Sequence, residues 1–378
     1  MFVDNFFSIQ HCDGNARNGT LKLAHGTVQT PIFMPVGTNA TVKALRAADV
    51  EALGYRLILS NTYHVYLRPG IEVIAAAGGL HEFMGWNHNI LTDSGGYQVF
   101  SLAPFRKITE EGVQFRSHID GSLHDLSPEK VVHIQTVFHS DILMPLDVCT
   151  PWGISYQESV EALKTTTQWL DRSVKTWKKT QQDGSKGMLF AIVQGNFFRD
   201  LRVESVENTL KYDTPGVALG GLSVGEPQEV FLEYLAYTTA LLPVQKPRYV
   251  MGIGSPDYIL AAIENGIDMF DCILPTRTGR TGRVFTRDGH LSLKKEERRF
   301  DFKPIDSECS CSVCRSHTRA YLRHLFKTQE ILCSILATYH NLYFLEELVR
   351  NARQAIKEHR FSSFKAVFLK RYFSQKEE

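Results

Sequence analysis

The chain has 378 residues, of which 43% are hydrophobic and 22% charged; this composition excludes a disordered chain, and the length accommodates one barrel of about 250 residues plus a further module. No apolar run reaches the roughly 18 residues of a transmembrane helix, and the amino terminus lacks the pattern of a secretory signal, so we expect a cytoplasmic protein outside the membrane. The formal net charge is +1, but residues 1–276 carry 21 Lys and Arg against 29 Asp and Glu, whereas residues 277–378 carry 21 against 12. The basic part suits a polyanionic partner, although an inert dipolar surface explains the asymmetry equally well.

The first predicted element is a β-hairpin. Apolar residues at 6–10 and 21–23 flank Asp13-Gly14-Asn15, residue types that favour tight turns. Eight short apolar runs follow, at residues 31–36, 56–60, 89–91, 141–146, 188–193, 216–219, 248–251 and 267–270. Stretches with helical spacing lie between most of them, at residues 127–138, 156–179, 198–212, 230–242 and 257–265.

This alternation of strand and helix patterns predicts an α/β fold with a parallel sheet. Eight units indicate closure into a (β/α)8 TIM barrel, while a doubly wound open sheet remains the alternative because periodicity does not reveal closure. Polar residues and glycines follow one run after another, as in Asn61-Thr62 and Gly220-Gly221. Because the carboxyl ends of barrel strands carry the active site, we expect the chemistry at that end.

The pattern changes after Asp271. Residues 275–301 are rich in Arg, Lys and Gly, and residues 321–373 return to helical spacing. We therefore predict three parts. Residues 1–275 form the barrel with its hairpin and active site, residues 276–345 form a basic zinc-binding insert before the last barrel helix, and residues 346–378 form a helical segment that completes the barrel.

Three cysteines, Cys309, Cys311 and Cys314, lie within six residues. Thiols this close in a cytoplasmic protein point to a metal, and zinc prefers four sulfur and nitrogen ligands in a tetrahedron. His317, His324, Cys333 and His340 are candidates for the fourth ligand by position. A site closed by four protein ligands would be structural rather than catalytic, and the alternative is three buried cysteines without a metal.

Three aspartates, Asp93, Asp147 and Asp271, stand at predicted strand ends. Any one of them could be a structural or capping carboxylate. Three at the same end of one barrel favour chemistry, because two carboxylates that flank a glycosidic carbon are the usual means of displacement there, one as nucleophile and one as acid/base.

Several motifs together resemble those of the bacterial tRNA-guanine transglycosylases, the queuine tRNA-ribosyltransferase family. The motifs are Asp93-Ser94-Gly95-Gly96-Tyr97-Gln98, Val193-Gln194-Gly195, Gly220-Gly221-Leu222-Ser223-Val224-Gly225-Glu226, Met251-Gly252-Ile253-Gly254, Phe270-Asp271-Cys272-x-Leu274-Pro275-Thr276-Arg277, and Cys309-x-Cys311-x2-Cys314 with His340. The resemblance covers nearly the whole chain, and it implies a pentosyltransferase that exchanges the wobble guanine (position 34) of G-U-N anticodon tRNAs for 7-aminomethyl-7-deazaguanine in queuosine biosynthesis.

In that family Asp271 would be the nucleophile that forms a covalent aspartyl-ribosyl-tRNA intermediate, and Asp93 would be the general acid/base. Residues that would bind the base are Ser94, Gly95, Gly96, Tyr97, Asp147, Gln194, Gly221, Leu222, Glu226 and Met251. Residues that would bind the tRNA anticodon loop are Gly252, Ile253, Gly254, Ser255, Pro256, Asp257, Tyr258, Thr276, Arg277, Thr278, Gly279 and Arg280. The resemblance also implies one structural Zn²⁺ per chain on Cys309, Cys311, Cys314 and His340, no organic cofactor, and a homodimer.

Two positions depart from the family pattern. Bacterial members usually have Glu where Val148 stands and often Lys where Ser255 stands, whereas Val224 and Cys149 look bacterial rather than eukaryotic. The incoming base could therefore be queuine, in a salvage enzyme of the same fold. A non-catalytic tRNA-binding subunit and a barrel glycosidase or metal-dependent hydrolase are two further hypotheses; the presence of both Asp93 and Asp271 argues against the former, and the absence of an early His-x-His argues against catalytic zinc in the latter.

Overall fold

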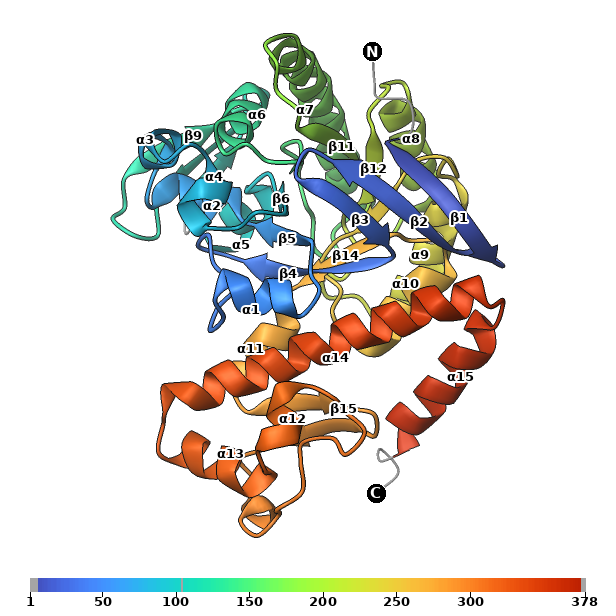
Figure 1. Ribbon diagram of the computed structural model, residues 1–378. Coiled ribbons are helices and arrows are strands. Elements are labelled where there is room, and N and C mark those ends of the chain that lie inside the picture. Colours follow the sequence, from blue (N-terminus) through green and yellow to red (C-terminus); the bar gives the residue numbers. More distant parts are fainter. Residues whose placement is uncertain (1–5, 103–104, 375–378) are drawn as a thin grey trace.

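A computed structural model, which describes residues 6–102 and 105–374, contains a closed barrel of eight parallel strands (Figure 1). In chain order these strands are β4 (Ile32–Gly37), β5 (Leu57–Ser60), β6 (Asn89–Thr92), β10 (Ile142–Leu143), β11 (Met188–Val193), β12 (Gly216–Leu219), β13 (Arg248–Val250) and β14 (Met269–Cys272). The ring closes where β14 pairs with β4, with Met269 opposite Ile32 and Asp271 opposite Met34. The predicted (β/α)8 barrel is confirmed, and the open doubly wound sheet is excluded.

The barrel strands are buried on both faces, which explains their continuous apolar runs. Met34, Leu59 and Ile192 belong to the cluster that fills the barrel interior, whereas neighbouring residues such as Phe33 and Ile58 pack outward against the helices. The alternation of side chains along each strand thus separates two apolar cores with the strand backbone between them.

Helices surround the barrel and its carboxyl-terminal end. They are α1 (Ala47–Ala52), α2 (Thr62–Leu67), α3 (Ile71–Ala76), α4 (Leu80–Met84), α5 (Gly96–Leu102), α6 (Pro128–Val137), α7 (Tyr156–Gln182), α8 (Arg199–Leu210), α9 (Gln228–Ala240) and α10 (Pro256–Glu264). Capping side chains explain where two of these helices begin. The hydroxyl of Ser127 accepts the N–H of Lys130 before α6, and Ser155 forms a reciprocal capping box with Glu158 before α7.

Two antiparallel sheets lie outside the barrel. The predicted hairpin forms as β1 (Phe7–Asp13) and β2 (Ala16–Leu23), and β3 (Gly26–Thr30) adds a third strand that the sequence did not indicate. Leu21 and Val28 of this sheet join the interior barrel cluster. The second sheet consists of β7 (Arg106–Ile108), β8 (Val113–Arg116) and β9 (Leu123–Leu126), and it was not predicted.

The carboxyl-terminal part follows β14. Its elements are α11 (Leu274–Arg280), β15 (Arg283–Thr286), β16 (Gly289–Ser292), the 3-10 helix η1 (Glu296–Arg298), α12 (Ser312–Ser316), α13 (Arg319–Lys327), α14 (Ile331–Lys357) and α15 (Phe361–Tyr372). Figure 1 shows α14 running between the barrel and the small elements beneath it, and it contacts both β4 and α12. One helix therefore crosses the expected boundary at residue 346, so the division into three parts stays a prediction. Among the described residues, no helix is long and apolar enough to cross a membrane.

Candidate active site and metal centre

A cavity of about 430 Å³ opens at the carboxyl ends of the barrel strands. Asp93, Asp147 and Asp271, which follow or end strands β6, β10 and β14, all line it. The three carboxylates that the sequence placed on separate strand ends therefore share one cavity, as expected for the catalytic end of a barrel.

Asp271 is held by one of its two carboxylate oxygens. The Tyr249 hydroxyl donates to Oδ1 at 2.6 Å and the Gly252 N–H donates to the same atom at 3.1 Å. Burial raises the pKa of Asp271, while these two hydrogen bonds oppose the rise. No described residue donates to Oδ2, so the carboxylate is fixed through one oxygen and the other oxygen is left without a donor.

Both carboxylate oxygens of Asp93 accept hydrogen bonds from Asn61 and Thr62, the two polar residues that follow β5. The Thr62 N–H donates to Oδ1 at 2.8 Å, and the Asn61 side-chain amide donates to Oδ2 at 2.5 Å. Burial raises the pKa of Asp93 to about 6, and the negative charge of Asp271 contributes to the rise. A carboxyl group with this pKa can both give up and accept a proton near neutral pH.

Asp147 lies on another wall of the cavity. Its Oδ2 accepts from the Gln194 side-chain amide at 2.6 Å, and its Oδ1 accepts more weakly from the Ser94 hydroxyl at 3.4 Å. Burial raises the pKa of Asp147 to about 6. Gly96 leaves little room for a side chain here, because a Cβ would lie 3.0 Å from the Asp147 carbonyl oxygen. The side chains of Gln194 and Asp147 together offer donors and an acceptor to a planar polar ligand.

The loop after β12 adds backbone groups to the cavity, through Gly221 and Leu222. Glu226 does not line the cavity. Its two oxygens accept the N–H groups of Ser223 at 2.5 Å and Val224 at 2.8 Å. Because the Ser223 N–H and the Leu222 carbonyl belong to one trans peptide, this bond turns the Leu222 carbonyl away from Glu226. Gly95, Tyr97 and Met251 also line the cavity, and Tyr97 is 52% exposed.

A second group of chemically active side chains lies in the carboxyl-terminal part. Cys309, Cys311, Cys314 and His340 are all buried, and the three sulfur atoms lie 3.8, 3.5 and 3.4 Å from Nδ1 of His340. The other ring nitrogen, Nε2, donates to the Phe285 carbonyl oxygen at 2.7 Å, which leaves Nδ1 free as a ligand. Three thiols and one imidazole nitrogen form a set that could hold a metal ion.

The structure selects one of the four candidates for the fourth ligand. His340, from α14, completes the group, whereas His317 stacks on Tyr321, His324 is exposed, and Cys333 is buried without joining the four.

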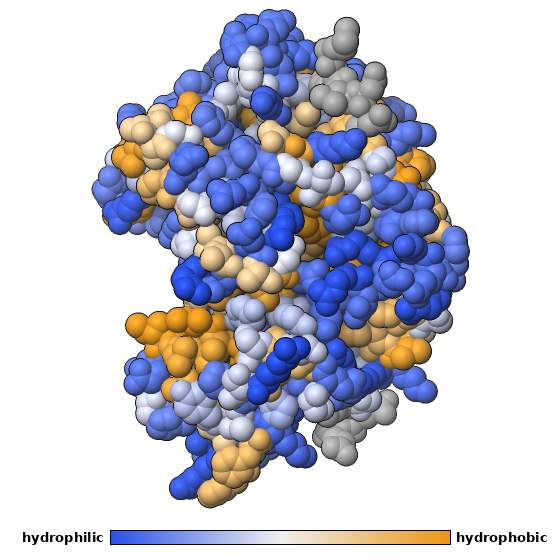
Figure 2. All heavy atoms as spheres, in the orientation of Figure 1, coloured by the Kyte–Doolittle hydropathy of each residue, from blue (hydrophilic) through white to orange (hydrophobic). Residues whose placement is uncertain are grey.

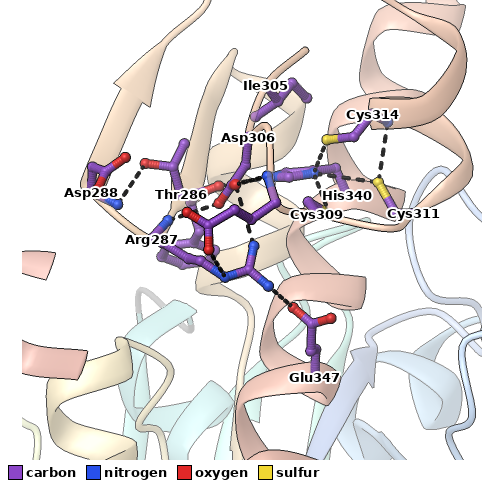
Figure 3. Close-up of polar contacts among 12 residues, drawn as sticks. Thr286, Arg287, Asp288, Ile305, Asp306, Cys309, Cys311, Cys314, His340 and Glu347 are labelled. Carbon is purple, nitrogen blue, oxygen red and sulfur yellow. Dashed lines mark hydrogen bonds and ion pairs between the residues drawn. The ribbon is translucent and has the colours of Figure 1, made fainter. Parts of the chain in front are cut away.

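Charged residues fix the turn beside this cluster of cysteines and His340 (Figure 3). The Arg287 N–H donates to Asp306 at 2.9 Å, and its guanidinium donates to Glu347 of α14 at 2.6 Å. The β15–β16 hairpin is thereby tied to the helix that carries His340.

The sequence is similar to that of one enzyme family over nearly its whole length. Residues 12–374 match the family described as queuine tRNA-ribosyltransferase. The queuine tRNA-ribosyltransferase of Treponema denticola is 56% identical over 368 residues, 97% of this chain and 97% of that protein. The enzymes of that name from Caldanaerobacter subterraneus and Borrelia duttonii are each 51% identical, over 96% and 95% of this chain and 96% of each protein. The chain belongs to the queuine tRNA-ribosyltransferase family. The resemblance that the motifs indicated is confirmed.

The residues expected to contact tRNA in this family fall into two sets. Gly252, Ile253, Gly254, Ser255 and Tyr258 line a second cavity of about 290 Å³. It shares Ser223, Gly252 and Cys272 with the first. The side chain of Ile253 is buried, as is Pro256, and Asp257 accepts a hydrogen bond from Gln228. In this first set, a ligand would therefore meet chiefly the backbone.

In the second set, on α11, the buried residues pack inward. Gly279 lies against α14, where a Cβ would be 2.9 Å from the Thr338 nitrogen, and Thr276 and Thr278 bond to carbonyls of their own helix. Arg277 is exposed and Arg280 partly exposed, and neither forms an ion pair with a described residue. Lys295, Arg298 and Arg299, by contrast, pair with Glu296 or Glu297. Two unpaired arginines of the basic part therefore lie on the helix that directly follows Asp271.

Sequence reasoning missed Tyr249, which bonds Asp271, and Arg202, whose guanidinium donates to the carbonyls of Gly220 and Gly221 beside the cavity. Tyr249 lies inside a barrel strand, where periodicity alone does not distinguish a cavity-facing side chain from a core one. Arg202 lies on α8, where an arginine ordinarily indicates a solvent-exposed face. Asn61 was recognisable in part, since its position directly after a strand marks it as polar and at the catalytic end.

Proposed function

We propose that the chain is a tRNA-guanine transglycosylase that replaces the wobble guanine, position 34, of G-U-N anticodon tRNAs with 7-aminomethyl-7-deazaguanine. The observation that carries this proposal is that Asp93 and Asp271 share one cavity while differing in their surroundings. Asp271 has one unbonded oxygen, whereas Asp93 is bonded at both oxygens and has a pKa of about 6. One carboxylate suits nucleophilic attack and the other suits proton transfer.

In the first step Oδ2 of Asp271 would attack C1′ of the ribose, forming a C1′–O bond as the bond from C1′ to the guanine nitrogen breaks. The protonated Asp93 would give its proton to the departing guanine. In the second step Asp93, now ionised, would remove the ring N–H proton of the incoming base, whose nitrogen attacks C1′ and releases the Asp271 carboxylate. Two displacements retain the configuration at C1′, and the exchange needs neither ATP nor an organic cofactor.

The groups around the cavity support recognition of a 7-deazaguanine or guanine base. Asp147 would accept the purine N–H groups, and Gln194 with the Gly221 N–H would donate to the carbonyl oxygen of the ring. Tyr97 and Met251 would cover the two faces of the flipped base. The Leu222 carbonyl, oriented through Glu226, would accept from the aminomethyl substituent.

The choice of incoming base is part of the proposal. Val148, which replaces the usual glutamate, is not among the residues that line the cavity; its side chain packs against the apolar core and its N–H donates to Thr166 at 3.0 Å. Cys149 and Val224 do line the cavity. These two residues favour 7-aminomethyl-7-deazaguanine over queuine. Competition of each base against radiolabelled guanine exchange would decide, and stronger competition by queuine would contradict the assignment.

We also propose Zn²⁺ at the Cys309, Cys311, Cys314 and His340 site. The donor set matches the preference of zinc for thiolate and imidazole, and four protein ligands leave no position for substrate. When bound, the ion would supply structural cross-linking between α12 and α14. One equivalent of zinc per chain in purified protein is the expected result of elemental analysis.

The anticodon loop of tRNA would reach the cavity across the surface formed by residues 252–258 and 276–280. Arg277 and Arg280 would meet phosphates, because guanidinium groups beside a reaction centre supply the sequence-independent part of RNA affinity. Single-stranded loops are also where a base can be turned out and read.

A homodimer is the assembly that we propose. Figure 2 shows apolar side chains gathered at the amino-terminal end of α14, where Ile331 is 79% and Leu332 40% exposed. Beside them, a cavity of about 620 Å³ lies between α1 and α14. Burial of such a patch against a second copy would remove apolar surface from water. Sedimentation should give dimers for the native chain and monomers for Ile331→Lys; a monomeric native chain at micromolar concentration would contradict the proposal.

The experiment that tests the proposed activity is incubation of the metal-loaded protein with a G-U-N anticodon tRNA and radiolabelled guanine. We expect label in the tRNA, and none with Asp271→Asn. A tRNA-binding subunit without activity would leave the tRNA unlabelled in both reactions.

A further inference from the structure

Arg202, on α8, is a fully buried cation without an acidic partner among the described residues. Its guanidinium instead donates to three backbone carbonyls: those of Asn196 at 2.7 Å, Gly220 at 2.8 Å and Gly221 at 3.2 Å. Burial lowers the pKa of Arg202 to about 10, so the group keeps its charge at neutral pH. The three carbonyls solvate the guanidinium, but no described carboxylate neutralises its charge. Burying a cation in this way is costly, so we expect the charge to have a function beyond packing.

Two of these carbonyls belong to peptide groups at the cavity wall. The Gly220 carbonyl shares a peptide with the Gly221 N–H, and the two point in opposite directions because the peptide is trans. With Arg202 on the carbonyl side, the Gly221 N–H faces the cavity, where it lies near the Cys149 thiol. The N–H interacts there with the Cys149 sulfur, a weak acceptor that an oxygen atom of a ligand can replace, and no oxygen atom of the described residues accepts from it.

Close backbone packing holds the loops after β11 and β12 against Arg202. At Gly195, where φ is +117°, a Cβ would lie 2.8 Å from the Arg202 backbone nitrogen, and at Gly220 a Cβ would lie 2.5 Å from the Gln194 side-chain amide. The loops after β11 and β12 thus approach α8 and each other as closely as backbone allows. The Gly220–Gly221 peptide has little freedom to turn its N–H elsewhere.

We propose that Arg202 is a positioning residue that acts through the Gly220–Gly221 peptide on the carbonyl oxygen of the bound purine. This inference rests on the proposed function, which puts that oxygen at the Gly221 N–H. A cation bonded to a peptide carbonyl polarises the peptide and makes its N–H a stronger donor. Negative charge that develops on guanine as its glycosidic bond breaks spreads to this oxygen, so the polarised N–H stabilises the transition state more than the ground state.

The indirect arrangement has a chemical reason. A guanidinium placed inside the cavity would pair with Asp147 or Asp271 and neutralise the carboxylates that the reaction uses. Placed behind the peptide, Arg202 contributes its field to the base while no carboxylate comes within ion-pair distance of it among the described residues.

The test compares guanine with 6-thioguanine, which keeps the ring N–H groups but replaces the carbonyl oxygen with sulfur, a weaker acceptor. Inhibition of radiolabelled guanine exchange gives the preference for the oxygen-containing base in full-length, metal-loaded protein. We expect Arg202→Met to reduce that preference about tenfold, the loss typical of one charge-assisted hydrogen bond, and to lower kcat while KM for tRNA stays within about twofold. Arg202→Lys, which keeps the charge but cannot span both glycine carbonyls, should give a smaller reduction in the same direction.

Arg248→Met is the matched control. Arg248 is also buried and donates to a backbone carbonyl, that of Leu242 at 2.7 Å, but it begins β13 at the opposite end of the barrel. This variant should keep the full preference for guanine. If Arg202→Met, or Arg202→Lys should the first not fold, weakens both bases equally, Arg202 is merely structural and the inference is overturned. A native protein that exchanges no guanine would instead refute the proposed function.

Discussion

Tyr249 donates its hydroxyl to Oδ1 of Asp271 at 2.6 Å, from one barrel strand to the next. The phenol is fully buried, and the nearby Asp271 charge contributes to the raised pKa of Tyr249 after burial itself. Tyr249 is therefore a permanent donor, and it fixes which Asp271 oxygen is left without a donor.

Tyr249→Phe should lower kcat by about tenfold. The lost hydrogen bond stabilises the ionised form of Asp271, so its pKa should rise further and the acidic limb of the kcat profile should move to higher pH. Tyr55→Phe is the control, since Tyr55 is equally buried but donates to Leu342, away from the cavity. An unchanged pH profile in Tyr249→Phe would show that this bond does not tune the nucleophile.

Asp147→Asn should increase stability while it impairs base exchange. Burial raises the Asp147 pKa from 3.8 to about 6, so the folded state favours the protonated form. Its stabilising contribution is complete below pH 3.8 and is lost as pH rises through 6. Without the titrating carboxylate, the variant should gain about 1–3 kcal/mol in free energy of unfolding at pH 7.5 relative to the native chain, and nothing near pH 4.

Chemical denaturation at the two pH values measures this difference. Asp120→Asn serves as the control, because the Asp120 pKa is lowered to about 2 by its serine partners. A gain of equal size at both pH values in Asp147→Asn would mean that charge burial is not its cause.

His340→Ala should remove the metal and destabilise the carboxyl-terminal part. The substitution leaves three buried thiols without their fourth partner and loses the bond to Phe285. Elemental analysis should show loss of zinc with a lower melting temperature, whereas His317→Ala should retain one equivalent. Full zinc content in His340→Ala would require a different ligand set.

Arg277→Ala should weaken tRNA binding without altering affinity for the free base. Loss of one phosphate contact should reduce the salt dependence of tRNA affinity by about one unit of slope. Arg299→Ala is the comparison, because Arg299 is exposed but lies near Glu296. Equal losses in the two variants would argue for a diffuse basic surface in place of contacts beside Asp271.

Much of the fold was predictable because each barrel strand is buried on both faces and leaves an uninterrupted apolar run. The sheet β7–β9 was not, since β7 is exposed along its whole length and lacks a buried face to create a pattern. The sequence also did not reveal where the last of the three predicted parts begins. Helix α14 has apolar residues toward both the barrel and the cysteine cluster, and it continues through residue 346.

Site residues at strand ends could be predicted from the sequence. Residues that only the folded chain brings to the site could not. Asp93 and Asp271 stand in recognisable motifs, and both line the cavity. His340 could not be separated from three other candidates by spacing, because only folding brings α14 against the cysteine loop. Arg202 could not be predicted from sequence patterns, because only the folded chain brings its guanidinium against the carbonyls of Gly220 and Gly221.

The covalent link to Asp271 is tested most directly by mass spectrometry of peptides from the reacted protein. The metal-loaded chain should be incubated with a short anticodon stem-loop RNA without added base, denatured, and digested with ribonuclease and protease. We expect a nucleotide fragment bonded to the peptide that contains Asp271, and none in Asp271→Asn. An adduct on any other residue, or guanine exchange by Asp271→Asn at the native rate, would contradict it.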